Sequence, residues 1–281
     1  MKKGLVLEGG AMRGMYTAGA LDIFMEQNIQ VDGVIGVSAG AVFGCNYKSR
    51  QIGRSVRYNL KYCKDPRYGK FRSLLKTGDI YEEDFCYHQI PEKLDPFDQE
   101  TYQSNPVEFY VTCTDVHTGK PVYHRSDKGD STDVRWMQAS ASMPLVSRVV
   151  SVDGYDLLDG GISDSIPITW FRKQGYEKNI VILTRPMGYR KKKGRFSGIM
   201  KHLMKEYPAM AKCMEERYLV YNKTLDEILR LEKAGEVFVL CPSSPFKVSR
   251  LESNPQKLKD LYELGRADAL KQLDEIRKFL A

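Results

Sequence analysis

The sequence predicts an α/β fold of three layers, in which helices cover both faces of a mostly parallel central sheet, followed by a helical C-terminal region. Short apolar runs rich in β-branched residues alternate with helical patterns, which is typical of parallel sheets. Two of these runs end in glycine-rich turns that open a helix. The 281 residues suffice for a sizeable core, and a hydrophobic fraction of 42% indicates an ordinary globular protein.

Composition also indicates the cellular setting. The six cysteines are scattered, with no C-x-x-C pair and no metal-like spacing, so we expect reduced thiols and no metal site. The N-terminal apolar run stops at Glu8, which is too short for a secretory signal, and no run approaches the length of a membrane span. These observations predict a cytoplasmic protein. The net charge of +7 is mild, so its placement matters more than its size.

The first predicted strand, residues 4–7, leads into a glycine-rich turn at residues 8–14. The helix that follows carries an apolar stripe at helical spacing, formed by Met15, Ala18, Leu21 and Met25. A glycine-rich turn at a helix start presents backbone N–H groups to an anion. That anion is either a phosphate, as in a dinucleotide-binding fold, or the oxyanion of a tetrahedral acyl intermediate.

The second predicted strand ends in the pentapeptide Gly36-Val37-Ser38-Ala39-Gly40, which has the pattern G-x-S-x-G. A serine on so sharp a strand-to-helix turn exposes its hydroxyl, and the flanking glycines give it room. A dinucleotide site requires an acidic residue at the far end of this strand, where the ribose would lie. Asp32 stands at the start of the strand and Ser38 at its far end, so the oxyanion interpretation is favoured. The glycine turn and Ser38 are then expected at the carboxyl ends of neighbouring strands, facing each other.

Residues 51–105 are predicted to form a helical insert between strands of the sheet. Apolar residues at helical spacing predict two helices there. Gly78 as a stop, followed by Asp79 and Glu82 as a capping box, predicts a third. Two interpretations of the insert stay open: plain packing on the core, or a lid over an apolar substrate channel.

Residues 107–183 are predicted to complete the sheet. Alternating apolar residues at 107–113 predict a strand that turns back through residues 122–124, and a helix from Ser131 ends at Pro144. The dipeptide Asp153-Gly154 lies between two short runs and predicts a hairpin. That hairpin delivers Asp159-Gly160-Gly161 at its exit, before a helix at 168–174 and a strand at 180–183.

The C-terminal part begins with a basic loop that contains Arg190, Lys191, Lys192, Lys193 and Arg195. Such a run is usually a solvated loop. It also leaves the carboxyl end of a strand and so is expected at the rim of the site, where cations attract anionic lipid head groups at a membrane surface. Nucleic acid is not an expected partner, because no aromatic-interleaved basic groove accompanies the loop.

We predict two parts of the chain, a core over residues 1–186 and an extension over 187–281 that packs on it. The extension is mainly helical, with one or two long amphipathic helices over 197–233, a returning strand at 237–240 and closing helices over 256–280.

A nucleophilic serine needs a base. In a Ser-Asp-His order the histidine follows the acid, and His202 alone lies beyond Asp159, on a predicted surface helix. The other histidines precede it and are typical of polar surface or hairpin positions: His88, His117 and His124. A histidine triad is therefore poorly supported, and Asp159 is the better base.

An aspartate with its ordinary pKa of about 3.9 is a weak base toward a hydroxyl. Burial beside Ser38 is expected to raise the pKa of Asp159 and to bring its carboxylate within hydrogen-bond reach. Gly160 and Gly161 allow the close backbone approach that this arrangement needs.

At this point the chain resembles the patatin-like phospholipase family. Three blocks match in order, namely Glu8-Gly9-Gly10-Ala11-Met12-Arg13-Gly14, Gly36-Val37-Ser38-Ala39-Gly40 and Asp159-Gly160-Gly161. Residues 139–144 also resemble the segment that precedes the family's catalytic aspartate, and the likeness spans about residues 4–186.

The resemblance implies a Ser–Asp dyad acyl hydrolase that cleaves ester bonds of phospholipids or other acyl lipids. By position, Ser38 matches the nucleophile and Asp159 the general base, supported by Gly36, Gly40, Gly160 and Gly161. The oxyanion element matches Gly9, Gly10, Ala11 and Arg13. Ala11 stands where many members have a third glycine, and a backbone N–H survives that change.

The expected reaction passes through an acyl-enzyme and uses no metal and no cofactor. Phospholipase A, lysophospholipase, neutral-lipid lipase and thioesterase activities stay open. A lipid-binding or scaffold module with little catalytic activity is the alternative, and we expect a cytoplasmic protein with peripheral contact at the membrane.

Overall fold

The computed structural model describes residues 1–194, 202 and 204–281. Within these residues an eight-stranded sheet has the order β5-β6-β3-β2-β1-β7-β8, with β4 also pairing with β3. The strands are β1 (Lys2–Leu7), β2 (Gly33–Val37), β3 (Glu108–Asp115), β4 (Pro121–Arg125), β5 (Val150–Val152), β6 (Tyr155–Asp159), β7 (Tyr176–Ile182) and β8 (Val237–Leu240). The five strands β3, β2, β1, β7 and β8 run parallel, whereas β4, β5 and β6 pair antiparallel.

The α-helices are α1 (Met15–Glu26), α2 (Ala39–Lys48), α3 (Arg54–Tyr62), α4 (Phe71–Thr77), α5 (Gln99–Ser104), α6 (Ser131–Ala141), α7 (Ile168–Lys173), α9 (Pro208–Lys233), α10 (Pro255–Lys271) and α11 (Leu273–Leu280). Short 3-10 turns lie at Ala11–Gly14 and Gly160–Ile162, and a π-helix spans Phe85–Leu94.

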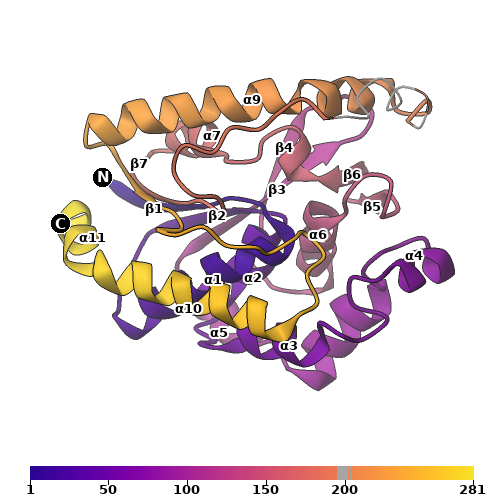
Figure 1. The fold of residues 1–281 in the computed structure, drawn as a ribbon, viewed down its shortest axis with the longest axis horizontal. Helices are drawn as coiled ribbons and strands as arrows, with labels where there is room; N and C mark the ends of the chain where they lie inside the picture. The colour runs from indigo at the N-terminus through magenta and orange to yellow at the C-terminus, as the bar shows by residue number, and fades with distance from the viewer. Residues whose placement is uncertain (195–201, 203) are drawn as a thin grey trace.

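Helices cover both faces of the sheet, which makes the predicted three layers (Figure 1). Alternate residues of a strand point to opposite faces, and β1 shows this directly. Leu5 and Leu7 pack with α1, α2 and α10 in one core, whereas Val6 packs with α7 and α9 in the other. Figure 1 shows α9 and α7 on one side of the sheet and α1, α2 and α10 on the other. The α/β prediction is confirmed.

The strand pairing confirms several local predictions. Leu7 of β1 pairs with Gly36 of β2 in a parallel register, so both strands end at the same edge of the sheet. The hairpin of β5 and β6 turns at Asp153 and Gly154, both of which have positive φ angles of 48° and 81°. The strand predicted at 237–240 forms β8 and extends the sheet beside β7.

One local prediction is wrong. Asp79 and Glu82 do not form a capping box. The Asp79 carboxylate instead accepts hydrogen bonds from the backbone N–H and the Nε of Arg148, both at 2.8 Å. The next helical segment has Asp84 as its N-cap residue. A long-range ion pair therefore outcompetes the local cap.

Candidate active site

Ser38 lies on a strained turn between β2 and α2, as the G-x-S-x-G pattern predicts. Its backbone has φ 54° and ψ −121°, a conformation that a non-glycine residue adopts only where the surroundings enforce it. A Cβ atom at Gly40 would lie 2.5 Å from the carbonyl oxygen of Leu7, so only glycine allows the helix to start this close to β1. Gly36 is equally crowded, by the backbone of Gly40. The Ser38 residue is 6% exposed and contributes to the wall of a pocket.

The glycine-rich turn after β1 lies against Ser38. A Cβ atom built on Gly9 would lie 3.2 Å from the Cβ of Ser38. Ala11 adopts a φ of 50°, which costs a non-glycine residue about 1–2 kcal/mol. Among the described residues, the amides of Gly10 and Ala11 have no hydrogen-bond acceptor, whereas Arg13 N–H donates to Gly10 O. Two backbone donors beside Ser38 are thus available to a ligand.

Asp159 ends β6 and is 6% exposed. Its Oδ1 accepts a hydrogen bond of 2.7 Å from the amide of Gly161. A Cβ atom at Gly160 would lie 2.1 Å from Thr112 O, so glycine is required for the chain to leave β6 this close to β3. Strands β2 and β6 flank β3 on its two sides. Val37 of β2 pairs with Thr112, and Asp159 of β6 pairs with the next residue of β3, Cys113. Ser38, which follows Val37, and Asp159 therefore lie at neighbouring positions on either side of β3.

The C-terminal end of α6 ties both segments together. The amide of Ser38 donates to Ser140 Oγ at 2.8 Å, and Ser140 Oγ donates to Thr112 O at 2.6 Å. Two residues further on, Ser142 O accepts a 2.8 Å hydrogen bond from the amide of Asp159. We call the contacts of Ser140 with the Ser38 amide and of Ser142 with the Asp159 amide the α6 anchor. Neither serine was predicted to act in this way, although both fall in the segment 139–144.

None of the four histidines lines the pocket beside Ser38. His202 is exposed. The others pair with carboxylates: His88 with Glu92, His117 with Asp156, and His124 with Asp133.

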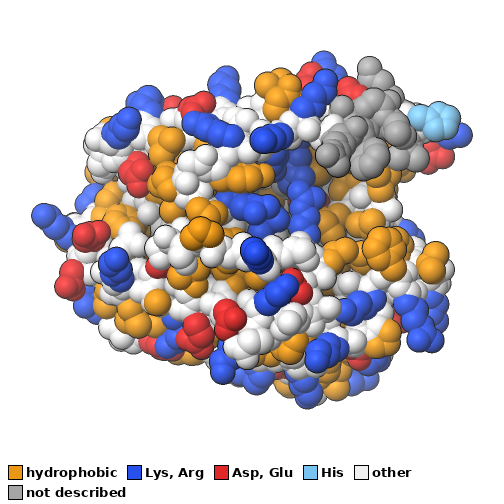
Figure 2. Space-filling view, in the orientation of Figure 1, with side chains coloured by type: hydrophobic (Ala, Val, Ile, Leu, Met, Phe, Trp, Pro, Cys, Tyr) orange, Lys and Arg blue, Asp and Glu red, His pale blue; other side chains and the backbone are white. Residues whose placement is uncertain are grey.

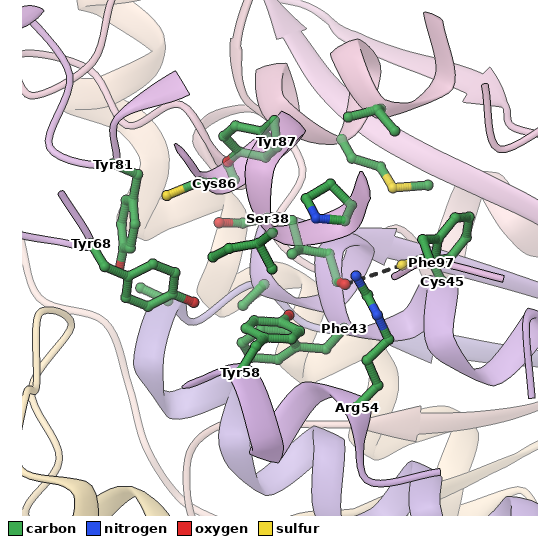
Figure 3. Close-up of a pocket in the computed structure, with 18 of the residues that line it drawn as sticks. Ser38, Phe43, Cys45, Arg54, Tyr58, Tyr68, Tyr81, Cys86, Tyr87 and Phe97 are labelled. Atoms are coloured by element: carbon green, nitrogen blue, oxygen red, sulfur yellow. Dashed lines mark hydrogen bonds between the residues drawn. The ribbon is translucent and has the colours of Figure 1, made fainter. Parts of the chain in front are cut away.

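The pocket beside Ser38 is lined mainly by apolar and aromatic side chains. Such a lining is typical of sites that bind apolar parts of a ligand. Figure 3 shows Ser38 among aromatic side chains from α2 and the 51–105 insert. The lining includes Ala11, Met12, Ser38, Phe43, Tyr58, Tyr68, Tyr81, Tyr87, Ile90, Phe97, Val134 and Met137.

One cation lines this pocket but is not free to bind a ligand. Arg54 donates through Nε and Nη2 to Asp95 O and through Nη1 to Asn46 Oδ1. Its role is to hold the insert against α2.

The basic loop divides into three parts. Arg190 donates to Asn222 O and forms an ion pair with Asp226, both on α9. Lys191 is half-buried, and its ammonium lies 4.1 Å from the centroid of the Tyr221 ring. Lys192 and Lys193 are exposed, and Arg195 lies outside the described residues.

No helix in the described part of the chain is both long and apolar enough to cross a bilayer.

Comparison with known proteins places these features in a family. Residues 5–171 match the family model of patatin-like phospholipases, and residues 207–281 match a domain of unknown function, DUF6363. The protein YjjU of Escherichia coli K12 is 27% identical over 272 residues, which cover 93% of this chain and 74% of that protein.

Two larger relatives carry functional names. Lysophospholipase nte1 of Aspergillus oryzae is 23% identical over 311 residues, which cover 98% of this chain. The patatin-like phospholipase domain-containing protein ZK370.4 of Caenorhabditis elegans is 28% identical over 177 residues, or 61% of this chain. The chain spans only 18% and 13% of these two proteins. Because the family match covers more than half of the chain and includes the glycine turn, Ser38 and Asp159, this protein belongs to the patatin-like phospholipase family.

Proposed function

We propose that this protein is a lipid acyl hydrolase in which Ser38 is the nucleophile and Asp159 the general base. The observation that carries the proposal is the α6 anchor, which holds the backbone amides of Ser38 and Asp159 at one helix end. Two buried polar residues fixed in this way, next to unpaired backbone amides, are the elements that acyl transfer needs.

In the proposed reaction, Asp159 takes the proton of the Ser38 hydroxyl while Ser38 Oγ forms a bond to the ester carbonyl carbon. Gly161 already occupies Oδ1 of Asp159, so the proton goes to Oδ2. The tetrahedral intermediate collapses with cleavage of the ester C–O bond, and the leaving alcohol takes the proton from Asp159. Water then attacks the acyl-enzyme with Asp159 again as base, which releases the fatty acid and restores Ser38.

The oxyanion of each tetrahedral intermediate is proposed to accept hydrogen bonds from the amides of Gly10 and Ala11. Gly9 provides the close approach of this turn to Ser38. Fixed donors of this kind are commonly the largest single contribution to acyl transfer, about 3–4 kcal/mol for one donor. Arg13 adds a positive charge directly after the turn.

We further propose that the apolar pocket binds the acyl chain of the substrate. Its walls come largely from the 51–105 insert, which supports the interpretation of that segment as a cover over the substrate channel. The exposed cations Lys192 and Lys193 support peripheral contact with an anionic membrane surface, with Arg195 as a further candidate. A cytoplasmic location is part of the same proposal. The alternative, a lipid-binding module with little activity, would use the same pocket without turnover.

The test is acyl release from short-chain esters, lysophospholipid and phospholipid vesicles. We expect Ser38→Ala and Asp159→Asn each to lower kcat by at least a factor of about 1,000. Asp156→Asn on the same strand and Ser104→Ala on exposed α5 are matched controls that should retain activity. If Asp159→Asn kept full activity while His202→Ala lost it, a histidine would be the base. If the wild-type protein bound lipid but released no acyl group, the binding-module alternative would hold.

A further inference from the structure

Five cationic side chains gather beside the glycine turn, and we call them the cation cluster. They come from four separate segments: the 3-10 turn after β1, the loop after β7, α9, and the loop between β8 and α10. The members are Arg13, Arg185, Lys191, Arg217 and Arg250. Figure 2 shows Lys and Arg side chains gathered in a hollow beneath α9.

The cluster lies next to the proposed catalytic residues. The amide of Met12 donates to Arg250 O at 3.3 Å, which holds the β8–α10 loop against the glycine turn. A Cβ atom built on Gly161 would lie 3.1 Å from Arg217 Nη2 and 2.9 Å from Asp159 Oδ1. Arg217 therefore lies beside the proposed base, although no ion pair joins the two within 4.0 Å.

The cations lack carboxylate partners at ion-pair distance. Within the described residues, none of the five forms a salt bridge. Arg13 is only 8% exposed, and the Nε atoms of Arg13 and Arg217 are buried without a hydrogen-bond partner. Residues 195–201 and 203 contain no Asp or Glu that could supply one. By contrast, all three guanidinium nitrogens of Arg54 donate hydrogen bonds to protein oxygens, as expected of a structural arginine.

Apart from the proposed base Asp159, a second carboxylate at the cluster, that of Glu8, is already engaged. Glu8 accepts from Tyr221 Oη at 2.7 Å through one oxygen, and from the amide and hydroxyl of Thr184 through the other. The positive charges of the cluster are therefore costly to keep at this partly buried position. Burial, reinforced by Arg185 and Arg250, lowers the pKa of Arg13 to about 10. Burial also lowers the pKa of Lys191 to about 7, and the charge of Arg217 acts in the same direction. An anion in the hollow would relieve this cost.

We propose that the cation cluster binds the phosphate of the lipid substrate's head group, and that the C-terminal region supplies this specificity through Arg217 and Arg250. Guanidinium groups bind phosphate oxygens in a bidentate fork, and several of them without carboxylate partners at one partly buried site form a strong phosphate site. The proposal rests on the proposed acyl hydrolase function.

The arrangement fits an amphipathic substrate. The apolar pocket is built by α2, the insert and α6. Arg185, Lys191 and Arg217 of the cluster come from the loop after β7 and from α9, which covers the other face of the sheet (Figure 1). The glycine turn joins the two, because Ala11 and Met12 line the pocket beside Ser38 and the next residue, Arg13, belongs to the cluster. A lipid with its acyl chain in the pocket and its phosphate in the cluster would place the ester bond at Ser38.

The experiment compares two substrates with the same acyl ester, a lysophosphatidic acid and the matching monoacylglycerol. For Arg217→Gln and Arg250→Gln we expect KM for the phosphate-bearing lipid to rise about 10- to 100-fold, because hydrogen bonds to charged groups are lost. The kcat/KM for monoacylglycerol should stay within about threefold. Lys223→Gln, an exposed cation on α9, is the matched control. Arg250 is exposed, so its variant tests the site even if Arg217→Gln lowers the melting temperature.

A parallel loss on both substrates would overturn the proposal and make the cluster a structural feature. Binding to Ser38→Ala protein separates this inference from the proposed function. If wild-type protein hydrolyses neither ester but Ser38→Ala protein still prefers the phosphate-bearing lipid in an Arg217-dependent way, only the hydrolase proposal fails. If inorganic phosphate competes as well as the lipid at equal concentration, the cluster is a free-phosphate site and the head-group assignment is wrong.

Discussion

At the scale of single residues, the position of Ser38 depends on side chains that do no chemistry themselves. Ser140 Oγ satisfies two backbone groups at once, the amide of Ser38 and the carbonyl of Thr112. Leaving a buried donor or acceptor unpaired costs about 1–3 kcal/mol. The strained φ of Ser38 persists because contacts of this kind enforce it.

We therefore predict that Ser140→Ala lowers kcat for a short-chain ester about 10- to 100-fold with little change in KM, because small displacements of a nucleophile are costly. Ser140→Thr, which keeps the hydroxyl, should restore much of the rate. Steady-state kinetics with a parallel thermal melt checks this. A lower melting temperature with an unchanged kcat would make Ser140 a stability residue only.

At the scale of elements, helix α6 has two functions. Its C-terminal end carries the α6 anchor, and its side facing the insert contributes Val134 and Met137 to the pocket wall. If the pocket binds the acyl chain as proposed, packing between α6, α2 and the insert sets the chain length that fits.

Val134→Trp is expected to fill part of this pocket. We predict that kcat/KM for long-chain esters falls at least about tenfold, whereas acetyl esters are hydrolysed within about twofold of wild type, since pocket sterics discriminate by about 1–3 kcal/mol. A chain-length series of chromogenic esters measures this. Val220→Trp on the exposed face of α9 is the control. An equal loss at every chain length would argue against the pocket as the acyl site.

At the scale of the whole molecule, the C-terminal region is built into the same core as the family domain. Strand β8 extends the sheet beside β7, and α10 packs along α1, where Tyr16 donates to Asp268 and Tyr262 donates to Asp22. The division of the chain at residue 187 stays a prediction.

The exposed cations of the basic loop predict how strongly the protein binds to an anionic membrane surface. Replacing exposed Lys192 and Lys193 by Gln should weaken binding to vesicles that contain anionic lipid by about tenfold or more, because each cation contributes about 1 kcal/mol near such a surface. Hydrolysis of a soluble ester should not change. Vesicle sedimentation at two salt concentrations checks this, with Lys271→Gln/Lys278→Gln as the charge-matched control. Loss of binding and soluble activity together would mean that the loop is structural.

The sequence alone determined the fold class and the positions of Ser38, Asp159 and the glycine turn, because these features are local. A strained turn after a strand and a β-hairpin are encoded by a few adjacent residues, and parallel strands bring their carboxyl ends to one edge. The hairpin at Asp153-Gly154 and strand β8 were predicted for the same reason.

Tertiary structure decided everything that depends on residues distant in the chain. Asp79 was predicted to cap a helix, but its carboxylate instead pairs with Arg148, 69 positions away in the chain. Arg217 follows Glu215 and Glu216 on an amphipathic helix and has the sequence pattern of a solvated face, yet it lies beside Asp159, and Arg250 reaches the glycine turn from the far end of the chain. The sequence does not show which charged side chains are desolvated in the folded protein without an oppositely charged partner. Desolvation depends on the helices, strands and loops that pack over a side chain, and these come from distant parts of the chain.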